Sequence, residues 1–209
     1  MWRRSILFLL IALPALAQER WQVGLAVTDN GATRMSYLGG GTSGASFNRQ
    51  ASAGIALNGG VRFLDFASSD LSATLDYQFK RRSPLGVTIT GQSYRSNIYD
   101  SYTAPGVQWN WHSPFDAGFG FQYRMERLQN VITNANYNRP WVLGYVGKTF
   151  DTGSNWRPYV ALRVGIALRT TGRPALDNQV GGIQDSESKQ LLRSLDGNAE
   201  LALQGGFRF

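Results

Sequence analysis

The chain contains no cysteine, and only one of its 209 residues is a histidine. Without cysteine, neither a disulfide framework nor a thiolate metal site is available, which excludes a disulfide-stapled extracellular module. Long apolar runs are also missing. After the first seventeen residues, no stretch reaches the roughly 18 consecutive apolar residues that a transmembrane helix needs. A membrane strand is not excluded, because it shows only about ten residues of alternation.

The N-terminal sequence MWRRSILFLLIALPALA has the composition of a secretory signal. A pair of arginines precedes a short apolar run, and Ala15-Leu16-Ala17 provides a small-x-small cleavage site. The apolar run is too short to span a bilayer as a helix. We therefore predict a Sec-type signal peptide over residues 1–17, cleaved after Ala17, followed by a single domain over residues 18–209.

Eight segments of the mature chain alternate between apolar and polar residues with the period of a β-strand. In the clearest of them, Arg157–Arg169, the aliphatic residues from Val160 to Leu168 share one parity and Arg163 lies on the other. The other seven are Trp21–Thr28, Ala51–Phe63, Leu71–Lys80, Tyr99–Trp111, Ala117–Glu126, Trp141–Phe150 and Ala199–Phe209. In Trp141–Phe150 both parities carry apolar residues, and we expect Trp141, Leu143 and Tyr145 to form the apolar face.

The polar parity distinguishes a soluble β-sandwich from a membrane barrel. It is rich in glycine, alanine, serine and threonine, with single charges between them, whereas a solvated sheet face carries charged residues in greater number. A narrow barrel interior needs small residues and paired charges, and strands with five aliphatic residues on one face suit contact with lipid. We therefore predict an all-β fold: a transmembrane, antiparallel, up-and-down β-barrel of eight strands.

The connections between the predicted strands alternate between long and short. This is the pattern of extracellular loops and periplasmic turns, and an even number of strands places both termini on the turn side. Leu85–Tyr94 also alternates, and we interpret it as an extension above the membrane within the second long loop. The alternative is a barrel of ten strands, with Asn30-Gly31 as a tight hairpin turn and a further strand near Arg34–Leu38.

The strand parity assigns a set of charged residues to the barrel interior, where they must pair because an isolated buried ion is costly. This predicted interior network consists of Arg62, Asp76, Arg124, Glu126, Arg163 and Glu200. It forms either a filled core or a gated passage. Lys80, Arg81 and Arg82 lie where the third strand enters its long loop, and from the outer surface they would contact lipopolysaccharide phosphates or remain solvated.

The mature chain as a whole resembles the small outer-membrane β-barrel proteins of Gram-negative bacteria, the family of the membrane domain of outer membrane protein A. The features that carry the resemblance are the signal sequence, the alternating strands and the terminal GGFRF. In that family a C-terminal phenylalanine is part of the address read by the barrel-assembly machinery, which implies this role for Phe207 and Phe209. The resemblance also implies the outer membrane as location, with its lipid and lipopolysaccharide as partners.

The sequence constrains function less than fold. His112 lies in a predicted periplasmic turn, at the opposite end from the outer leaflet on which enzymes of the resembled family act. We therefore predict no catalytic residue, metal site or cofactor, no nucleic-acid partner, and a monomer. We expect a structural or surface-interaction barrel that uses its long loops. The alternatives are a narrow channel or carrier for small solutes and, third, an outer-leaflet lipid-modifying enzyme.

Overall fold

The computed structural model describes residues 20–38, 44–89, 91–112, 114–131, 134–168, 193 and 195–209. They form one antiparallel sheet of ten strands. The strands are β1 (Trp21–Asp29), β2 (Thr33–Leu38), β3 (Gly44–Arg49), β4 (Ala53–Asp65), β5 (Ser69–Ile89), β6 (Gln92–Trp111), β7 (Asp116–Gln129), β8 (Asn134–Thr149), β9 (Arg157–Ala167) and β10 (Ala199–Arg208). The predicted signal peptide and its cleavage site after Ala17 lie outside the described residues.

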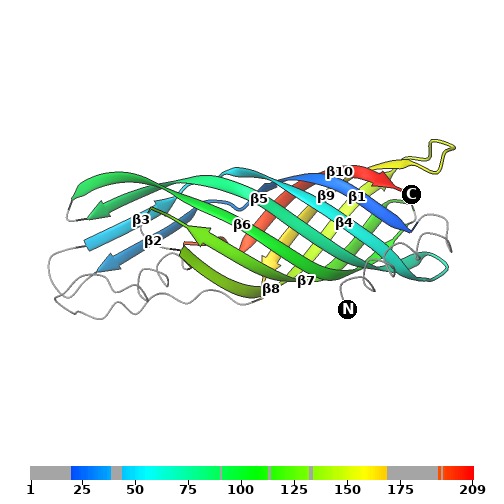
Figure 1. The fold of residues 1–209 in the computed structure, drawn as a ribbon, viewed down its shortest axis with the longest axis horizontal. Helices are drawn as coiled ribbons and strands as arrows, with labels where there is room; N and C mark the ends of the chain where they lie inside the picture. Colours follow the sequence, from blue (N-terminus) through cyan, green and yellow to red (C-terminus); the bar gives the residue numbers. More distant parts are fainter. Residues whose placement is uncertain are drawn as a thin grey trace, which may run out of the picture.

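Eight of the ten strands close into a ring in the order β1, β4, β5, β6, β7, β8, β9, β10 (Figure 1). β1 pairs with β10 from Gln22↔Arg208 to Asp29↔Leu201. Beyond that register, Trp21 and Phe209 exchange two further backbone hydrogen bonds. The first and last strands therefore leave no open sheet edge along this seam. The predicted antiparallel, up-and-down arrangement of eight strands is confirmed for the ring.

The two remaining strands, β2 and β3, form a hairpin outside the ring. β3 pairs with the far half of β5, from Ala45↔Ile89 to Arg49↔Leu85, and β2 pairs with β3. The alternative interpretation was therefore right to place a strand near Arg34–Leu38, but wrong to add it to the barrel. Asn30-Gly31 is not a hairpin turn, because β1 and β2 do not pair with each other.

β5 and β6 continue well beyond the ring as one long hairpin, seen at the left of Figure 1. Their pairing runs from Ser69↔Trp111 to Ile89↔Gln92. Leu85–Tyr94 therefore contributes the tip of this hairpin and is not a separate strand. It lies beyond the ring, as predicted, but it continues β5 and β6 instead of standing within a loop. We call the tip together with β2 and β3 the loop-end extension. An apolar cluster fills the adjoining end of the molecule, formed by Phe47, Leu85, Ile98, Leu128, Ala135 and Leu195.

The ring carries its apolar side chains on the outside and its charged ones on the inside. In β9, Val160 and Ile166 are 49% and 57% exposed, whereas Arg163 is 4% exposed. All ring strands contribute to this outer apolar belt, which includes Val23, Leu25, Ile55, Leu57, Leu75, Val107, Phe119, Phe121, Val142, Leu162, Leu201 and Leu203. Half of each strand's surface is thus apolar where a soluble sandwich would present polar residues.

β8 faces the opposite way from the prediction. Trp141 and Leu143 are buried and Tyr145 is partly buried, whereas Val142 and Val146 lie on the exposed face. The expected face of Trp141, Leu143 and Tyr145 is therefore wrong. Both parities of this strand are apolar, so alternation alone gave no means of choosing between them.

β5 contains a bulge that reverses its parity. Gln78 lies opposite Tyr102 and Arg81 opposite Asp100, so three steps on β5 correspond to two on β6. One extra residue in a strand shifts every later side chain to the other face. Lys80 consequently faces outward and Arg81 is buried inside.

Candidate functional site

The centre of the ring holds four of the predicted interior residues in contact. Arg124 donates to both oxygens of Glu200, from Nη1 to Oε2 at 3.0 Å and from Nη2 to Oε1 at 2.8 Å. Arg163 forms an ion pair with Asp76, and its Nη2 lies 3.6 Å from Glu200 Oε1. Bidentate arginine–carboxylate pairs are among the strongest charge-assisted hydrogen bonds.

Two aromatic side chains, Tyr102 and Trp141, complete this central layer. The Arg124 guanidinium lies 3.9 Å from the ring centroid of Trp141 and 4.2 Å from that of Tyr102. The Tyr102 hydroxyl donates to Glu200 at 3.3 Å. These cation–π contacts explain why an apolar residue such as Trp141 lies inside the ring, because the indole face stabilises a desolvated cation.

A second layer of ion pairs lies closer to the loop end, which is the end of the ring that carries the loop-end extension. Arg139 donates to both oxygens of Glu126, at 2.6 Å from Nε and 3.0 Å from Nη2. The Trp141 indole N–H donates to Glu126 at 3.0 Å. Arg139 Nη2 also donates to Asp196 at 2.7 Å, so this layer ties β7 and β8 to the segment that precedes β10.

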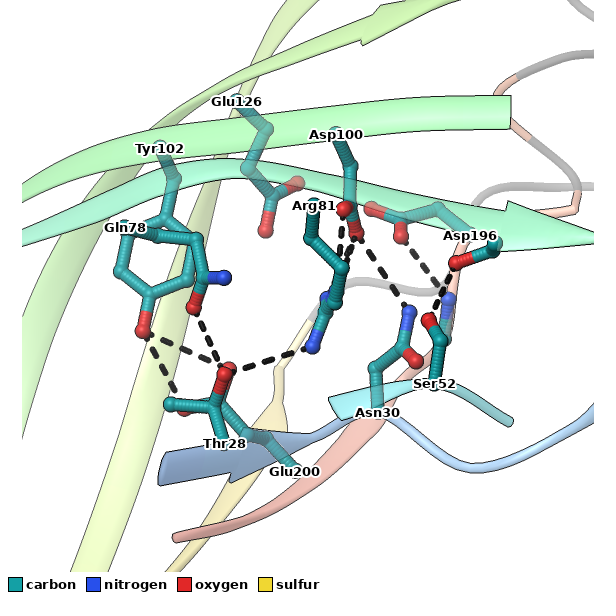
Figure 2. A network of polar contacts seen from close by, with 12 residues as sticks. Thr28, Asn30, Ser52, Gln78, Arg81, Asp100, Tyr102, Glu126, Asp196 and Glu200 are labelled. Carbon is teal, nitrogen blue, oxygen red and sulfur yellow. Dashed lines mark hydrogen bonds and ion pairs between the residues drawn. The ribbon is translucent and has the colours of Figure 1, made fainter. Parts of the chain in front are cut away.

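A third layer lies at the mouth of the ring, at the loop end, and Figure 2 shows its Arg81, Asp100 and Asp196. Arg81 donates to Asp100 from Nε at 2.9 Å and from Nη2 at 2.5 Å. Arg49 bridges two acids, with Nη2 2.6 Å from Asp100 and Nη1 2.9 Å from Asp196. Next to Asp196, Leu195 is 1% exposed and belongs to the apolar cluster. We call Leu195 and Asp196 the mouth latch, because their contacts hold the segment before β10 in the opening of the ring.

The three layers together are electrically balanced. Five buried arginines face five buried carboxylates, and each of the ten contacts a group of opposite charge. The arginines are Arg49, Arg81, Arg124, Arg139 and Arg163, and the acids are Asp76, Asp100, Glu126, Asp196 and Glu200. Breaking such a pair leaves an uncompensated buried charge, so each partner depends on the other.

The opposite end of the ring, where the short turns between strands lie, is called the turn end. It has a separate cluster of charges around His112. His112 Nδ1 lies 3.1 Å from Asp116 Oδ1, and Nε2 contacts Asp70. Arg62, the remaining predicted interior residue, pairs here with Asp70 at 3.2 Å rather than with the central layer. Arg208 Nη1 lies 3.2 Å from Asp116 Oδ2.

These contacts shift the pKa values of both His112 and Asp116. Hydrogen bonds to Asp116 and Asp70 raise the pKa of His112 to about 9, against the effect of burial. Burial alone raises the pKa of Asp116, but the hydrogen bond from His112 and the charge of Arg208 outweigh it and lower that pKa well below its usual value. At neutral pH the cluster therefore contains an imidazolium between two carboxylates.

The cavities differ between the two ends. A cavity of about 320 Å³ opens at the turn end beside His112 and Arg208. The cavity beside the second and third layers measures about 20 Å³, which is room for roughly one water molecule.

The three basic residues predicted to meet lipopolysaccharide are divided by the bulge. Lys80 is exposed, donates to Gln129 at 3.0 Å and lies 4.6 Å from the Tyr99 ring centroid. Arg82 is exposed and donates to Asn97 at 2.9 Å. Arg81 belongs to the mouth layer, so its guanidinium does not lie on the outer surface.

The two C-terminal phenylalanines lie at the turn end of the ring. Phe207 is 48% exposed on the outer face. The Phe209 ring stacks on Trp156, with centroids 4.5 Å apart. Phe207 meets the same tryptophan edge-on at 6.0 Å, so all three rings form one aromatic patch.

Residues that were not predicted to lie inside the ring complete the site. They are Arg49, Arg81, Asp100, Arg139 and Asp196. Of these, only Asp100 lies in a predicted strand. No pattern in the neighbouring sequence indicated that these side chains would be buried.

Within the described residues, no group of three or more histidines or carboxylates is arranged to hold a metal ion. None of the helical segments there is long and apolar enough to cross a membrane. No protein-family model matches the chain, and no curated protein matches it either.

Proposed function

We propose that the chain is an integral outer-membrane β-barrel with a structural or surface-interaction role, which displays its loop-end extension at the cell surface. One observation carries this proposal. The ring pairs its own backbone all the way round, while its outer face is an apolar belt and its inner face holds the ions. A bilayer requires both properties, because lipid supplies no partner for an open sheet edge.

The apolar belt gives the energetic reason for a membrane location. Soluble monomers rarely expose contiguous apolar patches larger than a few hundred Å². Here exposed aliphatic and aromatic side chains follow all eight ring strands. Full burial of such a side chain gains about 1.5–3 kcal/mol, and these side chains are about half exposed, so each gains roughly 1 kcal/mol when it leaves water. Summed over the whole belt, transfer into lipid strongly favours insertion.

The filled interior favours a structural role over a channel. The ten paired charges occupy the axis, and the mouth latch lies at its loop end, where Asp196 is one of the ten. An eight-strand ring is only wide enough for its side chains to fill. Passage of a solute would require several buried ion pairs to separate at once, which is costly in a low dielectric.

The proposal assigns no enzymatic role to His112. A histidine whose pKa is about 9 remains protonated at neutral pH, so it cannot accept a proton there as a general base. Its two carboxylate partners come from different strands, and the contacts act as a clamp at the turn end.

The absence of native cysteine allows a direct test of the orientation. Ser93 lies on the tip of the loop-end extension and Ser154 in the β8–β9 turn, and both are exposed. Ser93→Cys and Ser154→Cys are matched changes at opposite ends. A bulky, membrane-impermeant maleimide applied to intact cells should label the first variant, and should label the second only after the outer membrane is permeabilised.

The unmodified chain is the control and should not react. Equal labelling of both variants in intact cells would contradict the proposed orientation. If the purified mature chain is monodisperse in buffer without detergent, with the belt residues protected from solvent, the barrel interpretation itself is wrong and a soluble fold replaces it.

A further inference from the structure

The cavity at the turn end is lined mainly by basic side chains that come from five different parts of the chain. It measures about 320 Å³ and opens at the end where the short turns lie. Its lining residues are Arg62, His112, Pro114, Asp116, Lys148, Thr149, Asp151, Arg157 and Arg208. Five of these are basic and two are acidic, and they are distributed around the opening rather than gathered on one strand.

The two acids of the lining offset only part of its positive charge. Asp116 is already engaged by His112, Arg208 and Thr149. Asp151 accepts a hydrogen bond from the backbone N–H of Gly153 at 3.0 Å, within its own turn. Because the pKa of His112 is raised to about 9, that ring adds a positive charge at neutral pH. Outside the lining, Asp65 and Asp70 pair with Arg62. Five basic residues therefore face four carboxylates, and the cavity retains an excess of one positive charge.

Several donors of the lining remain available. Arg62 uses Nε for Asp70 and Nη1 for Asp65, and Arg208 uses Nε for Gln22 and Nη1 for Thr149 and Asp116. Within the part of the chain that the structure describes, neither arginine donates a hydrogen bond from Nη2. Lys148 donates one hydrogen bond to the carbonyl oxygen of Pro114, at 3.1 Å.

We propose that this cavity binds a phosphate group. A planar carboxylate is satisfied by a single guanidinium fork, whereas a tetrahedral phosphate presents oxygens to cations that approach from several directions. The lining offers cations from β4, β8, β9 and β10 around one space. The volume lies at the lower end of ordinary small-molecule sites, which suits a phosphate monoester with a small substituent.

The phosphate has two chemically equivalent sources, a soluble phosphate ester or the headgroup of a lipid. Trp156, Phe207 and Phe209 form their aromatic patch at the same end, and such aromatic residues lie at headgroup level in a barrel. The site does not depend on the proposed function, because its lining is present whether or not the ring is inserted in a membrane.

The first test uses the purified full mature chain in a phosphate-free maltoside detergent. Isothermal titration with inorganic phosphate and with glycerol 3-phosphate at pH 7 and low ionic strength should show saturable binding. Acetate, as a carboxylate probe, should bind more weakly. Arg208→Gln should weaken phosphate binding about tenfold, and Lys148→Gln should weaken it about threefold.

Lys80→Gln is the matched control, because it removes the same charge from the exposed surface near the other end. It should leave phosphate affinity unchanged. Lys148 is itself exposed, so Lys148→Gln keeps the test valid if Arg208→Gln fails to fold. An equal loss of affinity in Lys148→Gln and Lys80→Gln would reduce the effect to net charge and overturn the site.

The second test identifies the source. Native mass spectrometry after incubation with phosphatidic acid or with diacylglycerol should show retention of the phospholipid alone if the source is lipid, and Lys148→Gln should reduce that retention. Binding of glycerol 3-phosphate without retention of phosphatidic acid supports a soluble ligand. The absence of saturable binding for all three phosphate probes, or acetate binding as tight as phosphate binding, would overturn the proposal.

Discussion

At the scale of single residues, charge in this protein is placed where it has partners. Glu200 shows the principle: it accepts hydrogen bonds from Arg124 and Tyr102 and forms an ion pair with Arg163, and these three partners come from different strands. Such partners keep a carboxylate ionised without water, because they replace part of its hydration. The cost of burial is therefore met inside the network, and the geometry of three strands is tied to one side chain.

His112 applies the same principle at the turn end, where it leads to a pH dependence. Its pKa is raised to about 9 in the folded state, against about 6.5 when unfolded. The stabilisation from the imidazolium is thus fully present below about pH 6.5 and is lost as the pH rises through about 9. The wild-type chain should lose about 1–2 kcal/mol of unfolding free energy between pH 6 and pH 9.5, allowing for solvent screening.

Urea unfolding in detergent micelles, followed by tryptophan fluorescence, measures this change. His112→Gln keeps hydrogen-bonding capacity but removes the charge, so its stability should fall clearly less than that of the wild type over the same interval. Since His112 is the only histidine in the chain, no other imidazole contributes. A His112→Gln variant that keeps the full wild-type slope would show that the clamp is not the titrating group.

At the scale of strands, alternation predicted most of the wall. The predicted strand Arg157–Arg169 corresponds to β9, which spans Arg157–Ala167. The predicted strand Ala199–Phe209 corresponds to β10, which spans Ala199–Arg208. This succeeds because a closed wall with unlike faces imposes a period of two on the sequence. Alternation failed at β8, where Trp141 is held inside by Glu126 and Arg124 rather than by hydrophobicity.

The interior layers were predictable only where both partners lie in the predicted strands. Asp76, Arg124, Arg163 and Glu200 follow from parity. Arg49 and Asp196, which lie at the mouth, are 147 positions apart, and nothing in either neighbourhood indicates the other. The bulge before Arg81 was equally unpredictable from the local sequence. It places Arg81 opposite Asp100, and that residue lies on another strand, β6.

The seam between β1 and β10 is where two glycines lie directly opposite each other, Gly24 and Gly206. A Cβ on Gly206 would lie 2.1 Å from the carbonyl oxygen of Val23 and 2.5 Å from the Cα of Gly24, both of them backbone atoms that cannot move aside alone. Gly206→Ala should therefore lower the unfolding free energy by about 1–3 kcal/mol.

Gly144→Ala is the matched control, since a Cβ at Gly144 on β8 meets nothing within 4 Å. It should be neutral or slightly stabilising, because alanine loses less backbone entropy than glycine in a strand. Retention of the folded, faster-migrating band on unheated gels, measured against temperature, compares the two. Equal behaviour of both variants would mean that the seam is looser than the contacts indicate.

At the scale of the whole molecule, the outer belt and the inner ions are two consequences of one constraint. A ring of eight strands has an inner space that side chains fill. Under the proposed membrane location, the middle of the outer face meets lipid and cannot carry charge. The charged residues of that part of the wall then have only the axis available, where they must pair, and the three layers hold five arginines and five carboxylates.

The position of the paired charges along the axis leads to a prediction for ion conductance. The wild-type chain in planar bilayers should show no steady current, because the central layer of Asp76, Arg163, Arg124 and Glu200 blocks the axis below the mouth latch. A double variant, Leu195→Ala with Asp196→Ala, releases the latch but leaves that layer intact, so it should remain silent too. Steady current steps in the double variant alone would place the seal at the mouth and make the chain a gated channel. Steps in the wild type would mean that the paired ions do not close the axis at all.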